Sequence, residues 1–242
     1  VVGVVLAFVV WAVLVGPDIQ VVIVRAVVVT LVIFLVILFL RYFSLLWFSY
    51  LGHAERNVLG VREIRELPAV SIIVPAYNEG RVLERALTSL MQLEYPEDDV
   101  LVVDDGSKDD TLEIASQWEG QRGAGLFRVI TKPNGGKASA LNAGIAHSKH
   151  PLVFCMDADS YLDPRTLLNA ARHFTDPAVG AVAGNVKVEN RGSIVTRLQA
   201  LEYIEGLNMP RRAQGFIAAV NIVPGPVGLF RREALEEIGG YD

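Results

Sequence analysis

The chain divides into a nearly continuous apolar N-terminal part and a longer part in which short apolar runs alternate with amphipathic segments. Residues 1–15 are apolar throughout, and residues 21–40 form a second run about as long as a helix needs to cross a bilayer. After residue 68, buried-type strands alternate with helical segments, which is typical of α/β proteins. The pattern predicts two transmembrane helices, at about 1–15 and 21–41, followed by a mainly parallel sheet flanked by helices.

The second apolar run is followed directly by cationic and aromatic side chains, which are Arg41, Tyr42, Phe43, Trp47, Phe48 and Tyr50. Such borders mark the ends of membrane spans, and the arginines between 41 and 65 favour a cytoplasmic location for the C-terminal part of the chain. We therefore expect a transmembrane region at 1–50, a polar linker at 51–68 and a globular domain at 69–242. The protein is expected to be a multi-pass protein of the cell membrane with this domain in the cytoplasm.

Two alternatives compete with a membrane span for the N-terminal part. A signal peptide would need a small-residue cleavage site, and none is convincing there. A buried hairpin would show alternating polar positions, which are absent. The chain starts without methionine and begins and ends inside apparent motifs, so we expect it to be a fragment of a longer protein.

The globular part is expected to alternate strands with helices throughout. The predicted strands are 69–75, 100–103, 126–130, the run from 152, 179–188 and 227–230. The predicted helices are 78–92, 109–118, 137–147, 164–174, 194–212 and 232–238. Asn78 is expected to cap the first of these helices.

The run that begins at residue 152 ends in two carboxylates, Asp157 and Asp159, separated by one residue. In an extended chain these two side chains point to the same side and can converge on one cation. Hard divalent ions such as Mg²⁺ take oxygen ligands and often share them with the phosphates of a substrate. The alternative for this motif alone is an acidic loop in which Asp159 or Ser160 caps the next helix.

Polar motifs follow two further predicted strands at the same kind of position. Pro-Ala-Tyr-Asn-Glu stands at 75–79 and Asp-Asp-Gly at 104–106, and in a parallel sheet both reach the edge that carries 157–159. Convergent carboxylates are costly unless they bind something, and a nucleotide with a metal ion would satisfy them. One aspartate can accept a hydrogen bond from a base edge, and the tyrosine can lie against a base ring. Asp-Gly turns are the structural alternative.

A glycine loop, Asn-Gly-Gly-Lys at 134–137, opens a predicted helix. Glycines allow backbone N–H groups to approach a phosphate at a helix N-terminus, and Lys137 adds a positive charge. The spacing differs from that of a Walker A motif, and the first strand is not followed by the glycine pattern of a Rossmann dinucleotide site. An exposed lysine is the alternative.

Composition limits the remaining classes. The net charge of −5 argues against nonspecific nucleic-acid binding. The single cysteine, Cys155, excludes an intrachain disulfide and is expected to be buried in the apolar run.

Taken together, the motifs resemble those of a known family. Ser-Ile-Ile-Val-Pro-Ala-Tyr-Asn-Glu at 71–79, Val-Val-Asp-Asp-Gly-Ser at 102–107, Asn-Gly-Gly-Lys-Ala-Ser-Ala-Leu-Asn at 134–142 and Asp-Ala-Asp at 157–159 are similar to those of family 2 glycosyltransferases with the GT-A fold. The nearest subgroup is that of the membrane-embedded processive synthases of poly-N-acetylglucosamine, hyaluronan, chitin and cellulose. Gly-Pro-Val-Gly-Leu-Phe-Arg-Arg at 225–232 is also similar to this subgroup, and the resemblance covers about residues 69–242.

The resemblance implies a role for each matching residue. The nucleotide sugar is expected to contact Pro75, Ala76, Tyr77, Glu79, Asp104, Asp105, Lys137, Asp157 and Ala158. In this set Asp105, with Asp104 beside it, holds the uracil, and Lys137 approaches the diphosphate. Asp159, together with Asp157, binds Mg²⁺ or Mn²⁺, which offsets the charge on the departing UDP.

The implied activity is metal-dependent, inverting transfer of a sugar from a UDP-sugar, UDP-GlcNAc or UDP-glucose, to a growing β-linked polysaccharide at the membrane. The general base of the family lies in a Thr-Glu-Asp-like motif that is expected beyond Asp242, so no residue of this chain is assigned as the catalytic base. Arg212 and Gln214 are acceptor-side candidates, with a solvated amphipathic helix as the alternative.

Other functions stay open at this point. One is non-processive transfer to a lipid or oligosaccharide acceptor, and another is a nucleotide-sugar-binding module that lacks catalysis. A nucleotidyltransferase is weaker, because the glycine-rich basic first loop of that class is not seen after Pro75. The expected partners are the UDP-sugar donor, a polysaccharide or oligosaccharide acceptor and the lipid bilayer, without nucleic acid, and the resemblance allows accessory synthase subunits. The sugar, linkage, processivity, regulation and oligomeric state are not specified by the sequence.

Overall fold

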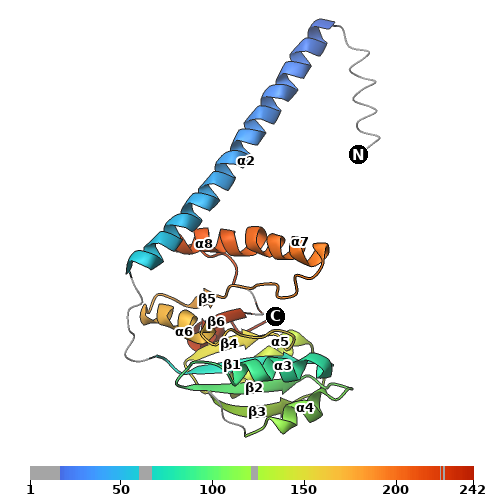
Figure 1. The fold of residues 1–242 in the computed structure, drawn as a ribbon, viewed down its shortest axis with the longest axis vertical. Coiled ribbons are helices and arrows are strands. Elements are labelled where there is room, and N and C mark those ends of the chain that lie inside the picture. Colours follow the sequence, from blue (N-terminus) through green and yellow to red (C-terminus); the bar gives the residue numbers. More distant parts are fainter. Residues whose placement is uncertain (1–16, 60–66, 121–124, 224, 226) are drawn as a thin grey trace.

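The computed structural model describes residues 17–59, 67–120, 125–223, 225 and 227–242. The first predicted membrane helix, at 1–15, lies outside these residues. The described chain has two parts, a long N-terminal helix and an α/β domain at its lower end (Figure 1).

The N-terminal helix, α2, runs from Pro17–Leu59 and contains 43 residues. Within it, Asp18–Ala54 is long and apolar enough to cross a membrane, and the most apolar window of this segment is not buried against the rest of the chain. The helix therefore starts near the predicted span at 21–41 but continues past it into the predicted linker. At 1.5 Å per residue, such a helix is longer than the ~30 Å hydrocarbon core of a bilayer is thick.

The α/β domain is built on one six-stranded sheet with the strand order β3-β2-β1-β4-β6-β5. The strands are β1 Val70–Ala76, β2 Asp98–Asp104, β3 Gly125–Thr131, β4 Leu152–Met156, β5 Ala181–Ala183 and β6 Val227–Arg231. The helices of the domain are α3 Gly80–Leu90, α4 Thr111–Gln117, α5 Lys137–His147, α6 Thr166–Ala171, α7 Ile194–Glu202, α8 Met209–Phe216 and α9 Arg232–Glu237. The predicted alternation of strands and helices is confirmed.

The sheet is mixed rather than uniformly parallel. Strands β3, β2, β1 and β4 pair in parallel, whereas β6 is antiparallel to both β4 and β5. The reversed strand has a simple cause: Ala183 at the end of β5 lies opposite Gly228 near the start of β6, so the chain re-enters the sheet at the edge it had left. A connection of this kind needs no crossover.

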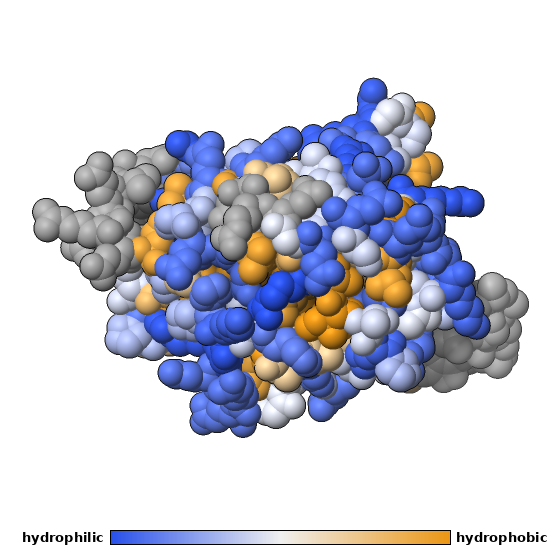
Figure 2. Space-filling model, turned by 90° about the horizontal axis from the view of Figure 1, so that it is seen from below, coloured by the Kyte–Doolittle hydropathy of each residue, from blue (hydrophilic) through white to orange (hydrophobic). Residues whose placement is uncertain are grey.

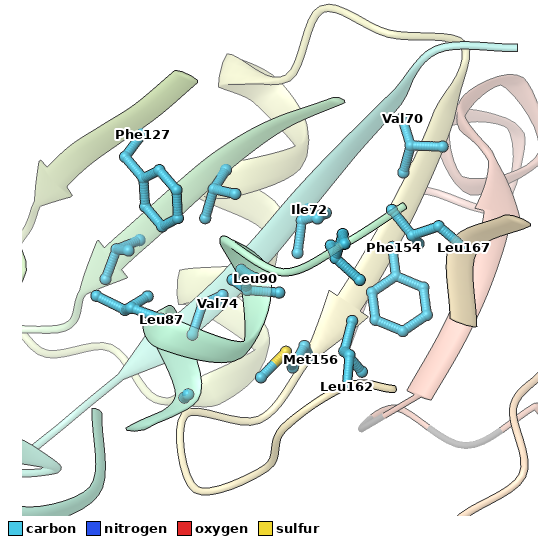
Figure 3. Packing of buried hydrophobic residues seen from close by; sticks show 14 of the residues in the cluster. Val70, Ile72, Val74, Leu87, Leu90, Phe127, Phe154, Met156, Leu162 and Leu167 are labelled. Atoms are coloured by element: carbon cyan, nitrogen blue, oxygen red, sulfur yellow. The ribbon is translucent and has the colours of Figure 1, made fainter. Parts of the chain in front are cut away.

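The core explains why the strands were visible in the sequence. Successive residues of β1 point to opposite faces. Ile72 and Val74 pack under α3, with Leu87 and Leu90 (Figure 3). Ile73 packs on the other face, under α5. Both faces of the central strands are covered, so these strands contain apolar runs, such as 100–103 in β2, rather than an alternation of apolar and polar residues.

Several predicted elements differ in extent. The strand expected at 179–188 is only Ala181–Ala183, and the helix expected at 164–174 is divided into α6 and a 3₁₀ turn, Arg172–Thr175. The helical stretch after residue 194 contains a π-helical segment, Tyr203–Asn208, between α7 and α8.

The α7–α8 segment crosses between α2 and the sheet (Figure 1). It packs against the lower part of α2, where the rings of Phe48 and Phe216 are stacked with their centroids 6.0 Å apart. The opposite end of the domain, seen from below, has a mainly hydrophilic surface with apolar side chains between the polar ones (Figure 2).

Candidate active site

The motifs predicted to meet do meet, at the carboxyl edge of the parallel strands. Ala76 at the end of β1 is paired with Asp104 at the end of β2, which is paired in turn with Thr131 at the end of β3. The loops that leave these strands and β4 enclose a cleft of about 500 Å³. The cleft is lined by Pro75, Ala76, Tyr77, Glu79, Asp105, Asn134, Gly136, Lys137, Ala140, Asp157, Ala158 and Asp159.

The loop after β1 is held in place by the loop after β2. The backbone N–H of Asn78 donates to Ser107 Oγ at 3.0 Å, and the side-chain Oδ1 of Asn78 accepts from the N–H of Lys108 at 2.8 Å. Asn78 has a φ of 57°, in the left-handed region that asparagine tolerates better than most residues. This reciprocal pair fixes the loop that presents Tyr77 and Glu79 to the cleft.

The same contacts correct the prediction that Asn78 caps the first helix. Helix α3 begins after Glu79 and has no side-chain cap of its own. Its first N–H groups are satisfied from the other loop, since Glu79 N donates to Thr111 Oγ1 at 2.8 Å and Gly80 N donates to Asp109 Oδ2 at 3.2 Å. Hydrogen bonds from Thr111, chiefly, hold the pKa of Asp109 below its usual range.

Asp105 is the most heavily bonded carboxylate of the cleft, and it is almost fully buried. Its Oδ1 accepts from Lys132 Nζ at 2.5 Å and from Gly135 N at 3.0 Å, and its Oδ2 accepts from Gly136 N at 2.7 Å. Burial alone would raise the pKa of Asp105, but the hydrogen bonds from Lys132 and the two glycine amides lower it below its ordinary value. The carboxylate is therefore ionised and fixes the glycine loop.

Asp104, unlike Asp105, does not line the cleft. Its side chain is buried away from the cleft lining, where Oδ1 accepts from Ser107 N at 3.2 Å and Oδ2 from Thr131 Oγ1 at 3.1 Å. The expectation that Asp104 lies beside the nucleotide is thus not supported by its placement. Consecutive residues at a strand end point to opposite sides, so only one of the two aspartates can face the cleft.

Lys132 is a residue of this site that the sequence analysis missed. It follows β3 directly, and its ammonium bridges Asp105 and the carbonyl oxygen of Pro133, at 2.5 and 2.8 Å. The signal that would have found it is the one used for the other motifs, a polar residue just past the carboxyl end of a parallel strand.

Gly106 allows the two loops to approach each other. It has a φ of +73°, and a Cβ there would lie 2.9 Å from the backbone nitrogen of Asn134. A larger residue would push the glycine loop off Asp105, which explains the Asp-Asp-Gly order of the motif.

The two aspartates after β4 reach the cleft by a different geometry from the one expected. The strand ends at Met156, and residues 157–159 form a turn in which Ser160 N donates to Asp157 O at 3.1 Å. Both Asp157 and Asp159 nevertheless line the cleft. The prediction of an extended Asp-x-Asp was wrong, whereas the prediction that the two residues converge on the cleft is supported.

Negative charge gathers at this end of the cleft. Burial, followed by the charges of Asp159, Asp109 and Asp157, raises the pKa of Glu79 above its ordinary value. Lys137 at the start of α5 forms an ion pair with Asp157.

The residues present fit a divalent cation that is shared with a ligand. Within the described ranges, no group of three or more His, Cys, Asp or Glu side chains is arranged to hold a metal alone. Asp157 and Asp159 supply two carboxylates, and Mg²⁺ commonly binds through one or two carboxylates together with substrate phosphates. The pKa of Glu79 is raised first by burial and then by the neighbouring aspartates, and a cation held there would offset the second of these causes.

The acceptor-side candidates lie elsewhere. Arg212 and Gln214 are on α8, and neither belongs to the lining of the cleft. The carbonyl oxygen of Arg212 lies close to Gly52 of α2, so this part of α8 is a packing surface for the long helix.

The last described residues return to the sheet beside the cleft. Asn142 of α5 clamps Tyr241, donating to its carbonyl oxygen at 2.8 Å and accepting from its N–H at 2.9 Å. The hydroxyl of Tyr241 lies 3.4 Å from the sulfur of Cys155. Cys155 is buried, as predicted, and burial raises the pKa of its thiol to about 11, so it is no nucleophile at neutral pH.

The chain is similar in sequence to curated bacterial synthases. Poly-beta-1,6-N-acetyl-D-glucosamine synthase of Staphylococcus epidermidis is 32% identical over 188 residues, which are 77% of this chain and 45% of that protein. The Staphylococcus aureus enzyme of the same name is 31% identical over 182 residues, 74% of this chain and 43% of its own length. The chain thus spans about half the length of the curated relatives it matches.

Solved structures share the fold. Mannosyltransferase PcManGT from Pyrobaculum calidifontis, in complex with GDP-Man and Mn²⁺, superposes with a TM-score of 0.63 at 28% identity, over 83% of this chain and 56% of that one. TarS of S. aureus in complex with UDP-GlcNAc has a TM-score of 0.51 at 24% identity, over 72% of this chain and 48% of that one. The likeness confirms the predicted GT-A-like architecture of the α/β part.

The family model described as glycosyl transferase family 2 matches residues 71–239. This range contains every residue that lines the cleft. The chain therefore belongs to glycosyl transferase family 2.

Proposed function

We propose that this chain is the donor-binding part of a membrane-bound, inverting glycosyltransferase that transfers N-acetylglucosamine from UDP-GlcNAc to a growing β-linked polysaccharide. The observation that carries the proposal is the gathering of four sequence motifs, remote from one another in the chain, around one cleft at the carboxyl edge of the sheet. The polymer in the names of the relatives, which are synthases of poly-β-1,6-N-acetylglucosamine, supports N-acetylglucosamine as the sugar that is transferred.

The cleft offers a surface for each part of a nucleotide sugar. Tyr77 is 43% exposed at the rim and can lie against a base ring. Asp105 is held ionised at the inner end, where a base N–H can share it with the glycine-loop amides. Gly136 and Lys137, at the first turn of α5, face the place expected for the diphosphate, since a helix N-terminus favours an anion.

Asp157 and Asp159 would hold Mg²⁺ or Mn²⁺ together with that diphosphate. A bound cation would supply charge stabilisation of the nucleoside diphosphate that leaves. The chain's own residues orient the donor: the fixed loops set the depth of the base, and the turn at 157–159 sets the position of the sugar. No residue of the described chain is assigned as the base that deprotonates the acceptor.

We also infer that α2 crosses a bilayer and that α7 lies along the bilayer surface. The side chains of α2 are mostly exposed and apolar from Ile19 to Leu40, and the exposed aromatic residues Tyr42, Trp47 and Tyr50 follow. Tyr42 lines a groove together with Leu198 and Leu201 of α7. Exposed apolar residues of α7, at fractions between 50% and 76%, continue this surface: Ile194, Val195, Leu198 and Leu201. Such a surface is stable in contact with lipid rather than water.

The experiment that tests the proposal uses the full-length protein in lipid, with UDP-GlcNAc, UDP-glucose or GDP-mannose as donor and with Mg²⁺ or Mn²⁺ as metal. We expect metal-dependent release of UDP from UDP-GlcNAc and a product of increasing length. A preference for GDP-mannose would instead support a mannosyltransferase, the activity in the name of the structural neighbour from P. calidifontis. If no donor gives metal-dependent nucleotide release, the proposal is wrong.

A further inference from the structure

Lys132 and Lys137 both pair with an aspartate of the cleft, but the two pairs differ in burial. The Lys132–Asp105 pair is deep, with side-chain exposures of 20% and 3%, and two backbone amides reinforce it. The Lys137–Asp157 pair is open, with exposures of 53% and 26%, and the ammonium has no second partner among the described residues. The first pair is part of the framework, whereas the second can separate at little cost.

The position of Lys137 at the start of α5 allows another anion to replace Asp157 as its counterion. Lys137 is the first residue of α5, where the helix dipole disfavours a positive charge and favours an anion. Asp157 is the anion that satisfies the ammonium in this structure. A diphosphate at the start of α5 would satisfy it better, because it carries more charge and also meets the backbone amides of the first turn.

The negative charge of Asp157 is also in an unfavourable environment. It stands with Asp159 and Glu79 in a region where like charges repel, and Lys137 is the cation that offsets them. An ammonium on Oδ1 and a divalent ion on the same carboxylate would repel each other, so binding of the metal disfavours the ion pair with Lys137. The residues that attract a metal and the lysine that attracts a phosphate are therefore paired with each other until both ligands arrive.

We propose that Lys137 is an exchangeable counterion, which neutralises Asp157 in the unliganded cleft and moves to the diphosphate of the donor when a divalent cation takes its place on Asp157. The inference rests on the proposed function, since it assumes a metal and a nucleotide in this cleft. Its consequence is that metal and nucleotide favour each other's binding through one side chain, in addition to any direct contact between them.

The test measures binding, without turnover, on the full-length protein in lipid. Binding of Mn²⁺ is followed by the electron paramagnetic resonance of the free ion, with and without saturating UDP, and binding of UDP is measured at saturating Mn²⁺. For Lys137→Met we expect Mn²⁺ alone to bind roughly 5-fold more tightly, because the competing ammonium is gone. With UDP present this gain should disappear, and UDP itself should bind roughly 10-fold more weakly.

Lys149→Met is the matched control. Lys149 is an exposed lysine in the turn before β4, at the opposite edge of the sheet from Asp157, so the same change of charge there should alter neither affinity. Lys137→Gln, which keeps a polar side chain at the exposed site, should reproduce the Lys137→Met result.

Two outcomes would overturn the exchange while leaving the proposed function intact. One is an unchanged Mn²⁺ affinity in both Lys137 variants, which would show that the ammonium does not compete for Asp157. The other is a gain of the same size with and without UDP, which would show a field effect of the charge rather than a movement. If the unaltered protein binds neither Mn²⁺ nor UDP, the proposed function fails, and the exchange fails with it.

Discussion

Strand β2 begins with two buried aspartates, Asp98 and Asp99, and a second buried pair, Asp104 and Asp105, stands at its carboxyl end and directly after it. The two pairs differ in the hydrogen bonds that they accept. At the carboxyl end, the oxygens of Asp104 and Asp105 accept hydrogen bonds from the loops and from Lys132. At the amino end, Asp99 pairs with Arg128 at 2.5 Å, but no other residue that the structure describes donates a hydrogen bond to Asp98. All four side chains are buried, so burial alone does not distinguish the two ends.

The pKa values express the same difference. Hydrogen bonds outweigh burial at Asp105 and lower its pKa, whereas burial, followed by the charge of Asp99, raises the pKa of Asp98 to about 6. A carboxylate that the loops surround with donors stabilises the fold and stays charged at the edge that binds the ligand. A carboxylate buried without donors opposes the fold whenever it is charged. Substitutions at the two edges can test whether this contrast is real.

The largest expected effect is on turnover at the carboxyl edge. Asp159→Ala removes one of the two carboxylates of the turn after β4, and we expect activity of the full-length enzyme to fall by at least ~1000-fold, or about 4 kcal/mol in the barrier. The thermal unfolding curve should be unchanged, because Asp159 makes no hydrogen bond to other elements of the described chain. Asp163→Ala, in the same loop but outside the cleft lining, is the matched control and should keep most of the activity.

If the Asp159→Ala enzyme remains active with the normal dependence on metal, Asp159 is not a metal ligand. That result would argue against a metal-dependent active site at the carboxyl edge of the sheet.

The next effect is on stability. Asp105→Asn replaces an oxygen that accepts from Gly136 or Lys132 by an amide group that cannot accept, and it leaves the ammonium of Lys132 without its counterion. We expect the free energy of unfolding of the α/β domain in the full-length protein to fall by about 3 kcal/mol, measured by denaturant titration at pH 7. UDP affinity should fall as well, because the glycine loop loses its anchor.

This loss should depend on pH with a definite sign. Since the pKa of Asp105 is lowered in the folded state, its contribution is fully present above the ordinary aspartate pKa and is lost as the pH falls through the folded value. The unaltered protein and Asp105→Asn should therefore become more alike in stability in acid. A difference that stays constant down to pH 3 would show that the ionised form is not what holds the loop.

At the amino edge the expected sign is reversed. Asp98→Asn removes a buried charge that lacks donors, and we expect an increase of about 2 kcal/mol in the free energy of unfolding at pH 7. Because the pKa of Asp98 is raised in the folded state, to about 6, its unfavourable effect is absent below about pH 4, develops as the pH rises to 6 and is constant above that. The stabilisation by Asp98→Asn should follow the same course.

Glu97→Gln is the control for this variant, since it removes an adjacent charge without removing the buried carboxylate. Equal stabilisation by both variants would show that net charge, rather than the missing donors, governs the amino edge.

The sequence predicted most of the polar residues at the carboxyl edge of the sheet, but it gave no sign of the buried aspartates at the amino edge. Apolar runs buried on both faces are visible because they are uninterrupted, and polar residues that follow them then stand out, as at Asp105 and Asp157. Lys137 was indicated by the glycine loop before it. Asp98 and Asp99 precede the strand predicted at 100–103, where charged residues are common, and nothing local shows that they belong to β2 and are buried. Asp98 and Asp99 are buried by the strands on either side of β2, and the local sequence does not contain that information.

The errors at the site have a similar origin. Spacing predicted an extended Asp-x-Asp and a cap by Asn78, but the structure has a turn at 157–159 and an Asn78 that bonds to the loop after β2. The contact of Asn78 joins segments that are about 30 residues apart, which a local pattern cannot contain. Lys132 could have been found, because the rule that located the other motifs applies to the end of β3 as well.

The smallest effect tests whether each individual donor at the carboxyl edge counts. Thr131→Val keeps the shape of the side chain but removes the hydroxyl that donates to Asp104 Oδ2 at 3.1 Å, so a buried carboxylate oxygen loses a partner. We expect the free energy of unfolding to fall by about 1 to 2 kcal/mol. Thr88→Val is the matched control: its hydroxyl donates to a carbonyl oxygen of its own helix at an exposed position, and its removal should change stability by less than about 0.5 kcal/mol. If the two variants cost the same, the donors around Asp104 are replaceable by water, and the contrast between the two ends of β2 is one of geometry rather than of energy.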